Sequence, residues 1–534
     1  MIAEFHVYDT TLRDGAQQEG MNLSVADKLA ITELLDRLGV GYIEGGWPGA
    51  IPKDTEFFQR LAKEVTLTNA TLAAFGATRK AGTTAAADPQ VRALLDAATP
   101  VVTLVAKSDI RHVERALRTT AQENLAMIGD TVSFLVAEGR RVFLDAEHFF
   151  DGYRFDPAYT VECVRTAAEA GAEVVVLCDT NGGMLPPWVA QIVAEVKALV
   201  NHAYGIHCHN DTGCAVANTL AAVGAGAMHV QGTINGYGER TGNADLTAII
   251  PNLVVKNGLG AVGPAQLADL TAVAHAISEV TNIAPFARQP YVGMSAFAHK
   301  AGLHASAIRV DPDLYQHIDP VLVGNDRRML VSEMAGRASV ELKGKELGFD
   351  LAGQNAVLTR ITEKVKDLEA QGYTFDAADA SFELLLRGEL PSGRPEYFRV
   401  ESWRTISETA RGAAAGEAAS EATVKLWAGE RRFVATGEGN GPVNALDAAL
   451  RLALTVIYPE LEQIDLVDYK VRILDSARGT DAVTRVMIES TNGAEVWRTV
   501  GVGSNIIEAS WEALTDAFTY GLLRAGVAAR TGAD

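Results

Sequence analysis

The feature that most constrains the fold is an alternation of strand-like and helix-like segments through the first 260 or so residues. Short runs rich in β-branched residues alternate with longer Ala- and Leu-rich runs of helical period. The predicted strands are 5–9, 41–46, 71–76, 100–106, 141–146, 173–179, 204–208 and 228–234. The predicted helices are 24–38, 54–65, 88–97, 111–138, 158–170, 187–200, 213–225 and 244–257. Eight such pairs match an α/β fold of the (β/α)₈ (TIM) barrel type best, with a doubly wound open sheet as the alternative.

The rest of the chain has a different organisation. We predict a barrel over 1–263, a connector with helical subdomains over 264–395, and an α+β domain over 396–534. The last part contains an internal repeat, in which GEGNGPVNALDAAL begins at Gly437 and GVGSNIIEASWEAL begins at Gly501. Gly439 and Gly503 align at the same offset, and each copy follows two candidate strands and becomes a helix. This predicts two β-β-α units that pack together, with chance similarity as the alternative.

Composition and charge exclude several classes of protein. The 534-residue chain has 47 basic and 67 acidic residues, a formal charge of −20, which argues against nonspecific nucleic-acid binding. No stretch approaches the roughly 18 consecutive apolar residues that a membrane span needs. The acidic N-terminus does not match a secretory signal, and four cysteines are too few for a disulfide framework. We therefore expect a cytoplasmic protein with no nucleic-acid or membrane partner.

Polar residues gather where the predicted strands end. In a (β/α)₈ barrel these ends lie on one rim, where the working residues are found. The alternative is that they are ordinary solvated loop residues. The rim residues that we single out as candidates for binding and catalysis are Asp9, Arg13, Asp14, Glu44, Glu147, Thr180, His207, His209 and Asn243.

The most specific pair is His207 and His209, whose i, i+2 spacing on a strand points both side chains to the same side. Asp14 would complete a set of two histidines and one carboxylate, and Asn243 could add a neutral oxygen. Such nitrogen and oxygen ligands suit Mg²⁺, Mn²⁺ or Zn²⁺. Buried, hydrogen-bonded strand histidines are the alternative.

Arg13 adjoins the predicted metal ligand Asp14. A guanidinium beside a bound cation would stabilise the oxyanion formed on attack at the ketone of an α-keto acid. A structural salt bridge is the alternative for this arginine. Glu147 is placed to hold substrate or relay a proton, and Thr180 could donate a hydrogen bond to a substrate carboxylate.

Three long motifs carry a family resemblance: YDTTLRDGAQQEG at 8–20, HCHNDTGCAVANTLAAVGAGA at 207–227 and GTINGYGERTGNADL at 232–246. They resemble the DRE-TIM metallolyases, specifically the isopropylmalate/homocitrate/citramalate synthase family, over nearly the whole chain. The resemblance implies an acyltransferase that condenses acetyl-CoA with an α-keto acid in a Claisen-type reaction and then releases CoA by hydrolysis.

The resemblance also implies roles for residues. Asp14, His207 and His209 would hold the metal, with Asn243 as a further or weaker ligand. Arg13, Glu147 and Thr180 would contact or line the keto-acid pocket, and Asp9 and Glu44 are further substrate-binding candidates. His304, in FAHKAGLHASAI, matches a family histidine from the connector that often comes from a neighbouring subunit. It is a candidate base, coupled to Glu147. A family tyrosine downstream of it has no clear counterpart in the sequence.

Local features point to the citramalate branch, namely FLDAEHFFDGY at 143–153, CDTNGG at 178–183 and LVAKSDIRHV at 104–113. This branch implies pyruvate as acceptor and a place in isoleucine synthesis. The alternatives are 2-isopropylmalate synthase, which uses 2-oxoisovalerate in the leucine pathway, and an acyl-CoA lyase of the same superfamily.

The C-terminal repeat resembles the regulatory domain of isopropylmalate synthases. We expect its turns at Gly437, Gly439, Gly501 and Gly503 to bind an amino-acid effector, with isoleucine predicted and leucine as the runner-up. A dimerisation module without a ligand is the alternative. The resemblance also implies a homodimer or a higher homo-oligomer.

Overall fold

A computed structural model describes residues 5–408, 419–474 and 482–529. The chain divides into two compact units, each described here by itself. The first unit contains Met1–Phe297 and Ile318–Asp326, and the second contains Ala298–His317 and Arg327–Asp534. Within the described part of the chain, no helix combines the length and apolar character that crossing a membrane requires.

The first unit is built on a closed barrel of eight parallel strands, as the alternation predicts. The strands are β1 (His6–Asp9), β2 (Tyr42–Glu44), β3 (Thr71–Ala77), β4 (Val101–Lys107), β5 (Arg141–Glu147), β6 (Val174–Asp179), β7 (Tyr204–Cys208) and β8 (His229–Gly232). Pairing of β1 with β8 closes the ring, with Tyr8 opposite Gln231. The open-sheet alternative is therefore excluded.

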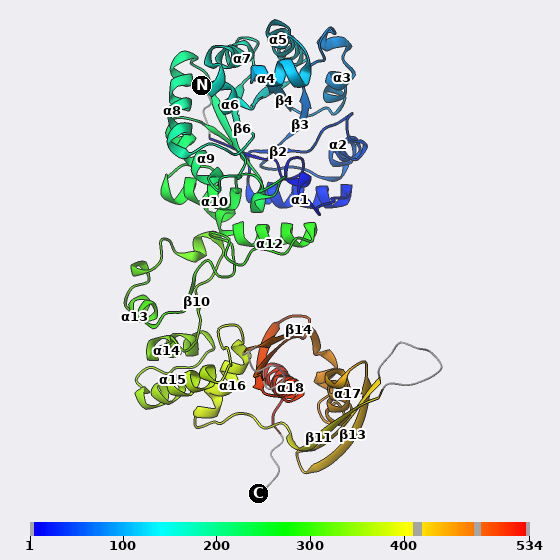
Figure 1. Cartoon of the computed structure of the whole chain (residues 1–534), viewed down its shortest axis with the longest axis vertical. Coiled ribbons are helices and arrows are strands. Elements are labelled where there is room, and N and C mark those ends of the chain that lie inside the picture. Colours follow the sequence, from blue (N-terminus) through cyan, green and yellow to red (C-terminus); the bar gives the residue numbers. More distant parts are fainter. Residues whose placement is uncertain (1–4, 409–418, 475–481, 530–534) are drawn as a thin grey trace, which may run out of the picture. The chain divides into compact units, whose positions relative to one another are not determined.

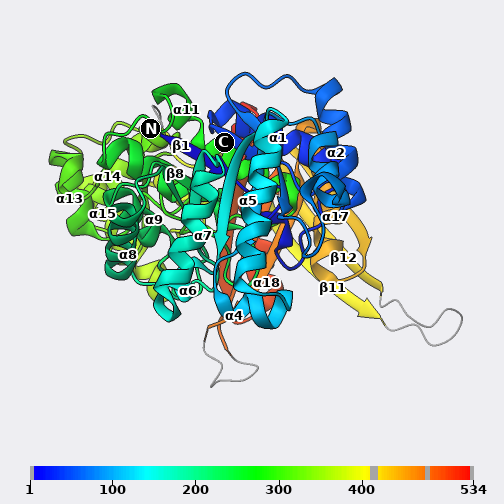
Figure 2. The ribbon, with the colours of Figure 1, turned by 90° about the horizontal axis from the view of Figure 1, so that it is seen from above.

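Helices lie on the outer side of these strands (Figures 1 and 2). They are α1 (Val25–Leu38), α2 (Pro52–Glu64), α3 (Pro89–Asp96), α4 (Ile110–His112), α5 (Ala121–Ala137), α6 (Phe149–Phe155), α7 (Pro157–Glu169), α8 (Pro186–Leu199), α9 (Ala215–Gly224), α10 (Leu246–Pro251), α11 (Pro264–Ala268) and α12 (Leu270–Thr281). Most match a predicted segment. The apolar faces of the helices that alternate with the strands pack on the barrel, so its main hydrophobic core lies between the two layers, whereas α12 packs on α1.

The single helix predicted over 111–138 is wrong. A short α4 passes into a π-helical turn over Val113–Leu117, and Arg118 then takes a left-handed conformation with φ of 55°. The helix restarts as α5 because the side chain of Thr120 accepts a hydrogen bond from the backbone N–H of Glu123. The Thr-x-x-Glu spacing is the signal that sequence analysis overlooked. The break places a loop at the barrel rim.

The second unit begins with helices. The stretch around FAHKAGLHASAI contains a short strand and the helix α13 (Gly302–Val310). The small strands β9 (Ala298–His299) and β10 (Arg328–Met329) pair in parallel. Three longer helices follow: α14 (Arg337–Glu346), α15 (Asn355–Ala370) and α16 (Asp379–Glu389).

The C-terminal repeat folds into two sheet-and-helix copies. The first contains β11 (Arg399–Glu408), β12 (Ala419–Ala428), β13 (Arg431–Gly439) and α17 (Pro442–Leu454). The second contains β14 (Asp465–Ile473), β15 (Thr484–Thr491), β16 (Val496–Gly503) and α18 (Ile506–Arg524). Each copy thus has the two expected strands and helix, preceded by an additional antiparallel strand. Apolar residues of both copies form one hydrophobic cluster.

Candidate active site

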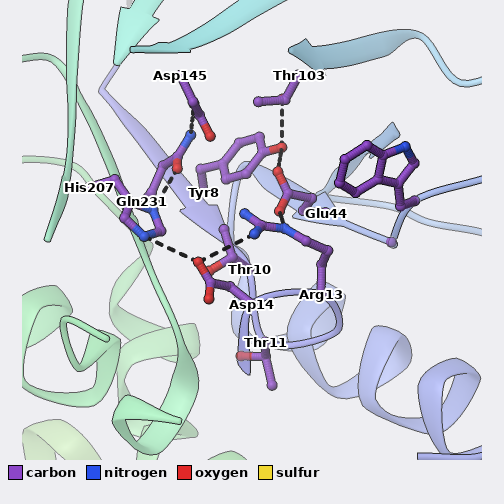
Figure 3. A network of polar contacts seen from close by, with 12 residues as sticks. Tyr8, Thr10, Thr11, Arg13, Asp14, Glu44, Thr103, Asp145, His207 and Gln231 are labelled. Carbon is purple, nitrogen blue, oxygen red and sulfur yellow. Dashed lines mark hydrogen bonds and ion pairs between the residues drawn. The ribbon is translucent and has the colours of Figure 1, made fainter. Parts of the chain in front are cut away.

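Three predicted metal ligands meet at the barrel rim. Figure 3 shows two of them, Asp14 and His207, facing each other. His207 lies in β7, His209 follows it, and Asp14 lies in the turn after β1. Oδ2 of Asp14 is 3.3 Å from Nε2 of His207 and 3.9 Å from Nε2 of His209. Ligand atoms of all three buried residues lie within 4.8 Å of one another. The alternation of side chains along β7 thus brings two imidazoles to one carboxylate, as the spacing predicted.

Two unpartnered atoms indicate that this cluster has room for a further bonding partner. Nδ1 of His209 and Oδ1 of Asn243 are buried without a hydrogen-bond partner among the described residues. Asn243 bridges to His209 through the backbone, and its Nδ2 donates to the carbonyl of Tyr237. Since buried polar atoms are usually satisfied, the unpartnered amide oxygen of Asn243 and the two-histidine, one-carboxylate set fit a divalent cation; Nδ1 of His209 is not the ring nitrogen nearest Asp14.

The electrostatics of the cluster favour the binding-competent forms of Asp14 and His209, whereas at His207 the hydrogen bond and charge of Asp14 outweigh burial and raise the pKa of the imidazole, so metal binding there displaces a proton. Burial opposes ionisation of Asp14, but Arg13 and the two histidines hold the pKa of this carboxyl far below its usual value. Burial and the neighbouring His207 lower the pKa of His209 to about 4. A carboxylate and a neutral imidazole are therefore available near neutral pH, and these are the forms that bind metal ions.

Arg13 lies between this cluster and a buried carboxylate. Its Nε donates to Glu44, its Nη1 is 3.4 Å from Oδ2 of Asp14, and its guanidinium stacks 3.8 Å from the ring centre of Phe75. Glu44 also accepts a 2.6 Å hydrogen bond from the hydroxyl of Tyr8, which is 2.6 Å from Oγ1 of Thr103 (Figure 3). The guanidinium is therefore held on two sides while part of it faces the rim.

A cavity of about 650 Å³ opens at this rim. Arg13, Asp14, His207 and His209 line it, together with Glu147 and Thr180. Oγ1 of Thr180 accepts a 2.9 Å hydrogen bond from the backbone N–H of His148, which leaves the hydroxyl proton of Thr180 free to be donated. The predicted substrate residues Glu147 and Thr180 thus share one cavity with the metal cluster.

Lys107, at the end of β4, also lines this cavity. It pairs in strand register with Glu147 at the end of β5, and the two side chains form an ion pair. Glu147 is therefore held by a cation within the cavity. No role was predicted for Lys107, although its position at a strand end is the signal that finds the other rim residues.

Two predicted substrate contacts do not line the cavity. Glu44 is fully buried behind Arg13, as described above. Asp9 is also fully buried, and its carboxylate accepts hydrogen bonds of 2.8 Å from the backbone N–H and the hydroxyl of Thr11. Burial raises the pKa of Asp9 to about 7. In this structure Asp9 contacts the turn after β1, and Glu44 contacts Arg13.

His304 belongs to the second compact unit and lies on α13. Its ring stacks on that of Tyr315, with centroids 4.1 Å apart. The tyrosine expected from the family resemblance has no clear counterpart in the sequence, and the tyrosine that contacts His304 is Tyr315. His304 lies in α13 and Tyr315 follows the short helix Pro312–Leu314, so no single periodic pattern predicts their contact.

Close packing explains at least two of the four glycines that were predicted to bind an effector, Gly437 and Gly501. A Cβ on Gly437 would collide with the backbone of Ala449, and one on Gly501 with that of Ala509. These two glycines thus let a strand lie close to its helix. A cavity of about 800 Å³ lies instead at the start of α17 and along β14, with Asn444, Asp447 and Tyr469 in its wall.

Comparison with known proteins identifies the family. A family model described as HMGL-like matches residues 4–277, one described as homocitrate synthase post-HMGL domain-like matches 291–373, and one described as the LeuA allosteric (dimerisation) domain matches 376–522. The chain is 64 % identical over 525 residues to the (R)-citramalate synthase of Streptomyces coelicolor, covering 98 % of each. The chain belongs to the citramalate synthase family. It is therefore an enzyme of the transferase class.

Other relatives agree with this assignment. The (R)-citramalate synthase of a Synechocystis strain is 49 % identical over 527 residues, which cover 97 % of this chain and 96 % of that protein. The 2-isopropylmalate synthase of Pyrococcus furiosus is 30 % identical over 526 residues, or 97 % and 99 % of the two chains. The family resemblance read from the three sequence motifs is confirmed.

Proposed function

We propose that this enzyme condenses the acetyl group of acetyl-CoA with pyruvate to give (R)-citramalate and CoA, in isoleucine synthesis in the cytoplasm. The observation that carries the proposal is the single cavity that Arg13, Glu147 and the Asp14–His207–His209 cluster share, in a chain that is 64 % identical to an (R)-citramalate synthase. In the overall reaction the acetyl methyl loses a proton, its carbon bonds to the keto carbon of pyruvate, and the keto oxygen becomes a hydroxyl. Water then cleaves the thioester.

We propose Asp14, His207 and His209 as the ligands of a divalent cation, with Asn243 as a neutral ligand. Such an ion supplies Lewis-acid polarisation of the keto acid when it is bound. Mg²⁺, Mn²⁺ and Zn²⁺ all remain candidates for this ligand set. Arg13 donates N–H groups to the keto oxygen as negative charge develops there. The ion pair with Glu44 and the stacking on Phe75 hold the guanidinium in place for this task.

The acetyl and carboxylate groups need separate partners. Thr180 donates its hydroxyl proton to the carboxylate of pyruvate, since His148 already satisfies its oxygen as an acceptor. Glu147 and His304 are the candidates for removal of the methyl proton, and Tyr315 orients His304 by stacking. The pairing with Lys107 fixes the direction in which the carboxylate of Glu147 faces the cavity.

The choice of keto acid rests on the apolar part of the cavity wall. Phe75, Ala77 and Val105, from β3 and β4, line it. Pyruvate carries a methyl group where 2-oxoisovalerate carries an isopropyl group, and such differences change binding by about 1–3 kcal/mol per methylene. A few side chains of this kind therefore suffice to favour the smaller acid.

We also propose that the C-terminal domain binds isoleucine as a feedback effector and joins copies into a homodimer. The match of 376–522 to the LeuA allosteric (dimerisation) domain supports both roles. Asp447 in the wall of the cavity at the start of α17 pairs with Arg451 through Oδ2, which leaves its Oδ1 for an ammonium group, and the ring of Tyr469 is available to an apolar side chain. Isoleucine should lower the rate of CoA release more than leucine does, and equal or absent inhibition would refute the effector assignment.

Product analysis tests the reaction. The enzyme is incubated with pyruvate, Mn²⁺ and acetyl-CoA labelled with ¹³C at both acetyl carbons, and the product is compared with (R)- and (S)-citramalate on a chiral column. We expect (R)-citramalate that carries both labelled carbons, together with stoichiometric free CoA. Formation of acetyl-CoA or pyruvate from added hydroxyacyl-CoA esters, with no condensation, would favour the acyl-CoA lyase alternative.

A further inference from the structure

Figure 3 shows a hydrogen-bonded chain behind one proposed metal ligand. Nδ1 of His207 is 2.8 Å from Oε1 of Gln231, and Nε2 of Gln231 donates a 2.9 Å hydrogen bond to Oδ1 of Asp145. Gln231 lies in β8 and Asp145 lies in β5, so the chain crosses the interior of the barrel between strands that are not neighbours. Gln231 is fully buried and Asp145 nearly so.

This chain determines which nitrogen of His207 carries the proton. Burial raises the pKa of Asp145 to about 7, but its Oδ1 accepts from the amide nitrogen of Gln231 in either protonation state, because a proton on the carboxyl can lie on Oδ2. The amide oxygen then faces His207 and requires an N–H group at Nδ1. That assignment leaves the lone pair of the neutral imidazole on Nε2, the atom that points to Asp14.

We propose that Gln231, oriented by Asp145, is a positioning residue that holds His207 in the Nδ1–H form and so prepares Nε2 to bind the divalent cation. This inference rests on the proposed metal centre. It assigns a role to two residues for which sequence analysis predicted none. Partners of this kind typically change metal affinity by about 10–100-fold.

Substitutions in this hydrogen-bonded chain can separate the positioning of His207 from simple packing of Gln231. Gln231→Leu removes the oxygen that accepts from Nδ1 of His207. Gln231→Glu keeps an acceptor there but sets a second carboxylate against Asp145. The double variant Gln231→Glu/Asp145→Asn restores a donor–acceptor pair, since the new amide donates to the new carboxylate. Gln191→Leu is a matched control, because Gln191 donates a 2.8 Å hydrogen bond to Glu195 on the exposed surface of α8.

The experiment measures Mn²⁺ binding to the full chain by the electron paramagnetic resonance signal of free Mn²⁺, without substrates. Circular dichroism melting checks that each variant is folded. We expect Gln231→Leu and Gln231→Glu to weaken binding by about 10–100-fold, the double variant to recover most of the loss, and Gln191→Leu to match the parent.

Two outcomes would overturn the inference. Folded Gln231→Leu that binds Mn²⁺ as tightly as the parent would show that the tautomer is fixed without Gln231. A double variant that binds Mn²⁺ no better than Gln231→Glu alone would show that a matched donor and acceptor at residues 145 and 231 do not affect metal binding. Failure of the proposed metal centre is distinguishable, because the parent enzyme itself would then bind no Mn²⁺.

Discussion

The guanidinium of Arg13 lies 3.4 Å from the carboxylate of Asp14, so the group proposed to receive the keto oxygen is a direct neighbour of the proposed metal site. The two residues are adjacent in the chain and share one turn after β1. Asp9 stabilises this turn, because its carboxylate accepts hydrogen bonds from the backbone N–H and the hydroxyl of Thr11. One short loop therefore supplies both the proposed oxyanion donor and one of the proposed metal ligands.

Replacing Arg13 tests the oxyanion role. Arg13→Lys should lower kcat by about 10²–10³-fold, because a lysine ammonium cannot both pair with Glu44 and reach the keto oxygen. Glu44→Gln should cause a smaller loss, since the guanidinium remains but loses its ionic partner. Steady-state kinetics with pyruvate measure both. Mn²⁺ affinity of Arg13→Lys within a few-fold of the parent serves as control, and an unchanged kcat would contradict the role.

Glu147 is tested by an isosteric change. Glu147→Gln should lower kcat by about 10²–10⁴-fold, because the amide cannot take up the methyl proton or relay it. Glu173→Gln is the matched control, since Glu173 is also paired with an arginine, Arg141, but precedes β6 at the opposite end of the barrel. Exchange of the acetyl methyl protons with deuterium, followed by mass spectrometry, measures removal of the methyl proton directly. Exchange at the parent rate in Glu147→Gln would remove this residue from proton transfer.

The buried carboxyl of Asp9 predicts a pH dependence of stability. Its pKa in the folded protein is raised to about 7, so between about pH 4 and 7 the folded state binds more protons than the unfolded state. Its contribution to stability is therefore greatest below the unfolded pKa and is lost as the pH rises through 7. We expect the stability of Asp9→Asn relative to the parent to rise across this range, on the order of a few kcal/mol. Urea unfolding at several pH values measures the difference, and a difference independent of pH would contradict the assignment.

The glycine repeat predicts a local effect on stability. Gly501→Ala should destabilise the C-terminal domain by about 1–3 kcal/mol, because the added methyl group overlaps the backbone of α18. Gly503→Ala is the control in the same strand, since the nearest atom to its added Cβ is 3.6 Å away. Thermal melting measures the stability of the Gly501→Ala and Gly503→Ala variants. Equal melting temperatures would show that the repeat glycines are conserved between the two copies for another reason than strand–helix packing.

The barrel and the residues that face its rim could be predicted from the sequence because both follow local periodicity. Strand runs, the i, i+2 pair His207 and His209, and the strand-end residue Asp14 each carry a signal within a few residues. Tyr8 and Gln231 lie behind the site, and Asp145 lines the cavity, but the contacts of all three arise only from the register of strands that are far apart in sequence. The strands β11 and β14 were missed because their alternation is mostly polar and exposed.

The most direct test of the central claim is the rate of CoA thiol release with acetyl-CoA and Mn²⁺ across pyruvate, 2-oxobutyrate, 2-oxoisovalerate and 2-oxoglutarate. The account predicts the highest kcat/KM for pyruvate, loss of the activity when EDTA removes the metal, and inhibition by isoleucine. A higher kcat/KM for 2-oxoisovalerate, with inhibition by leucine, would contradict the assignment to citramalate synthesis.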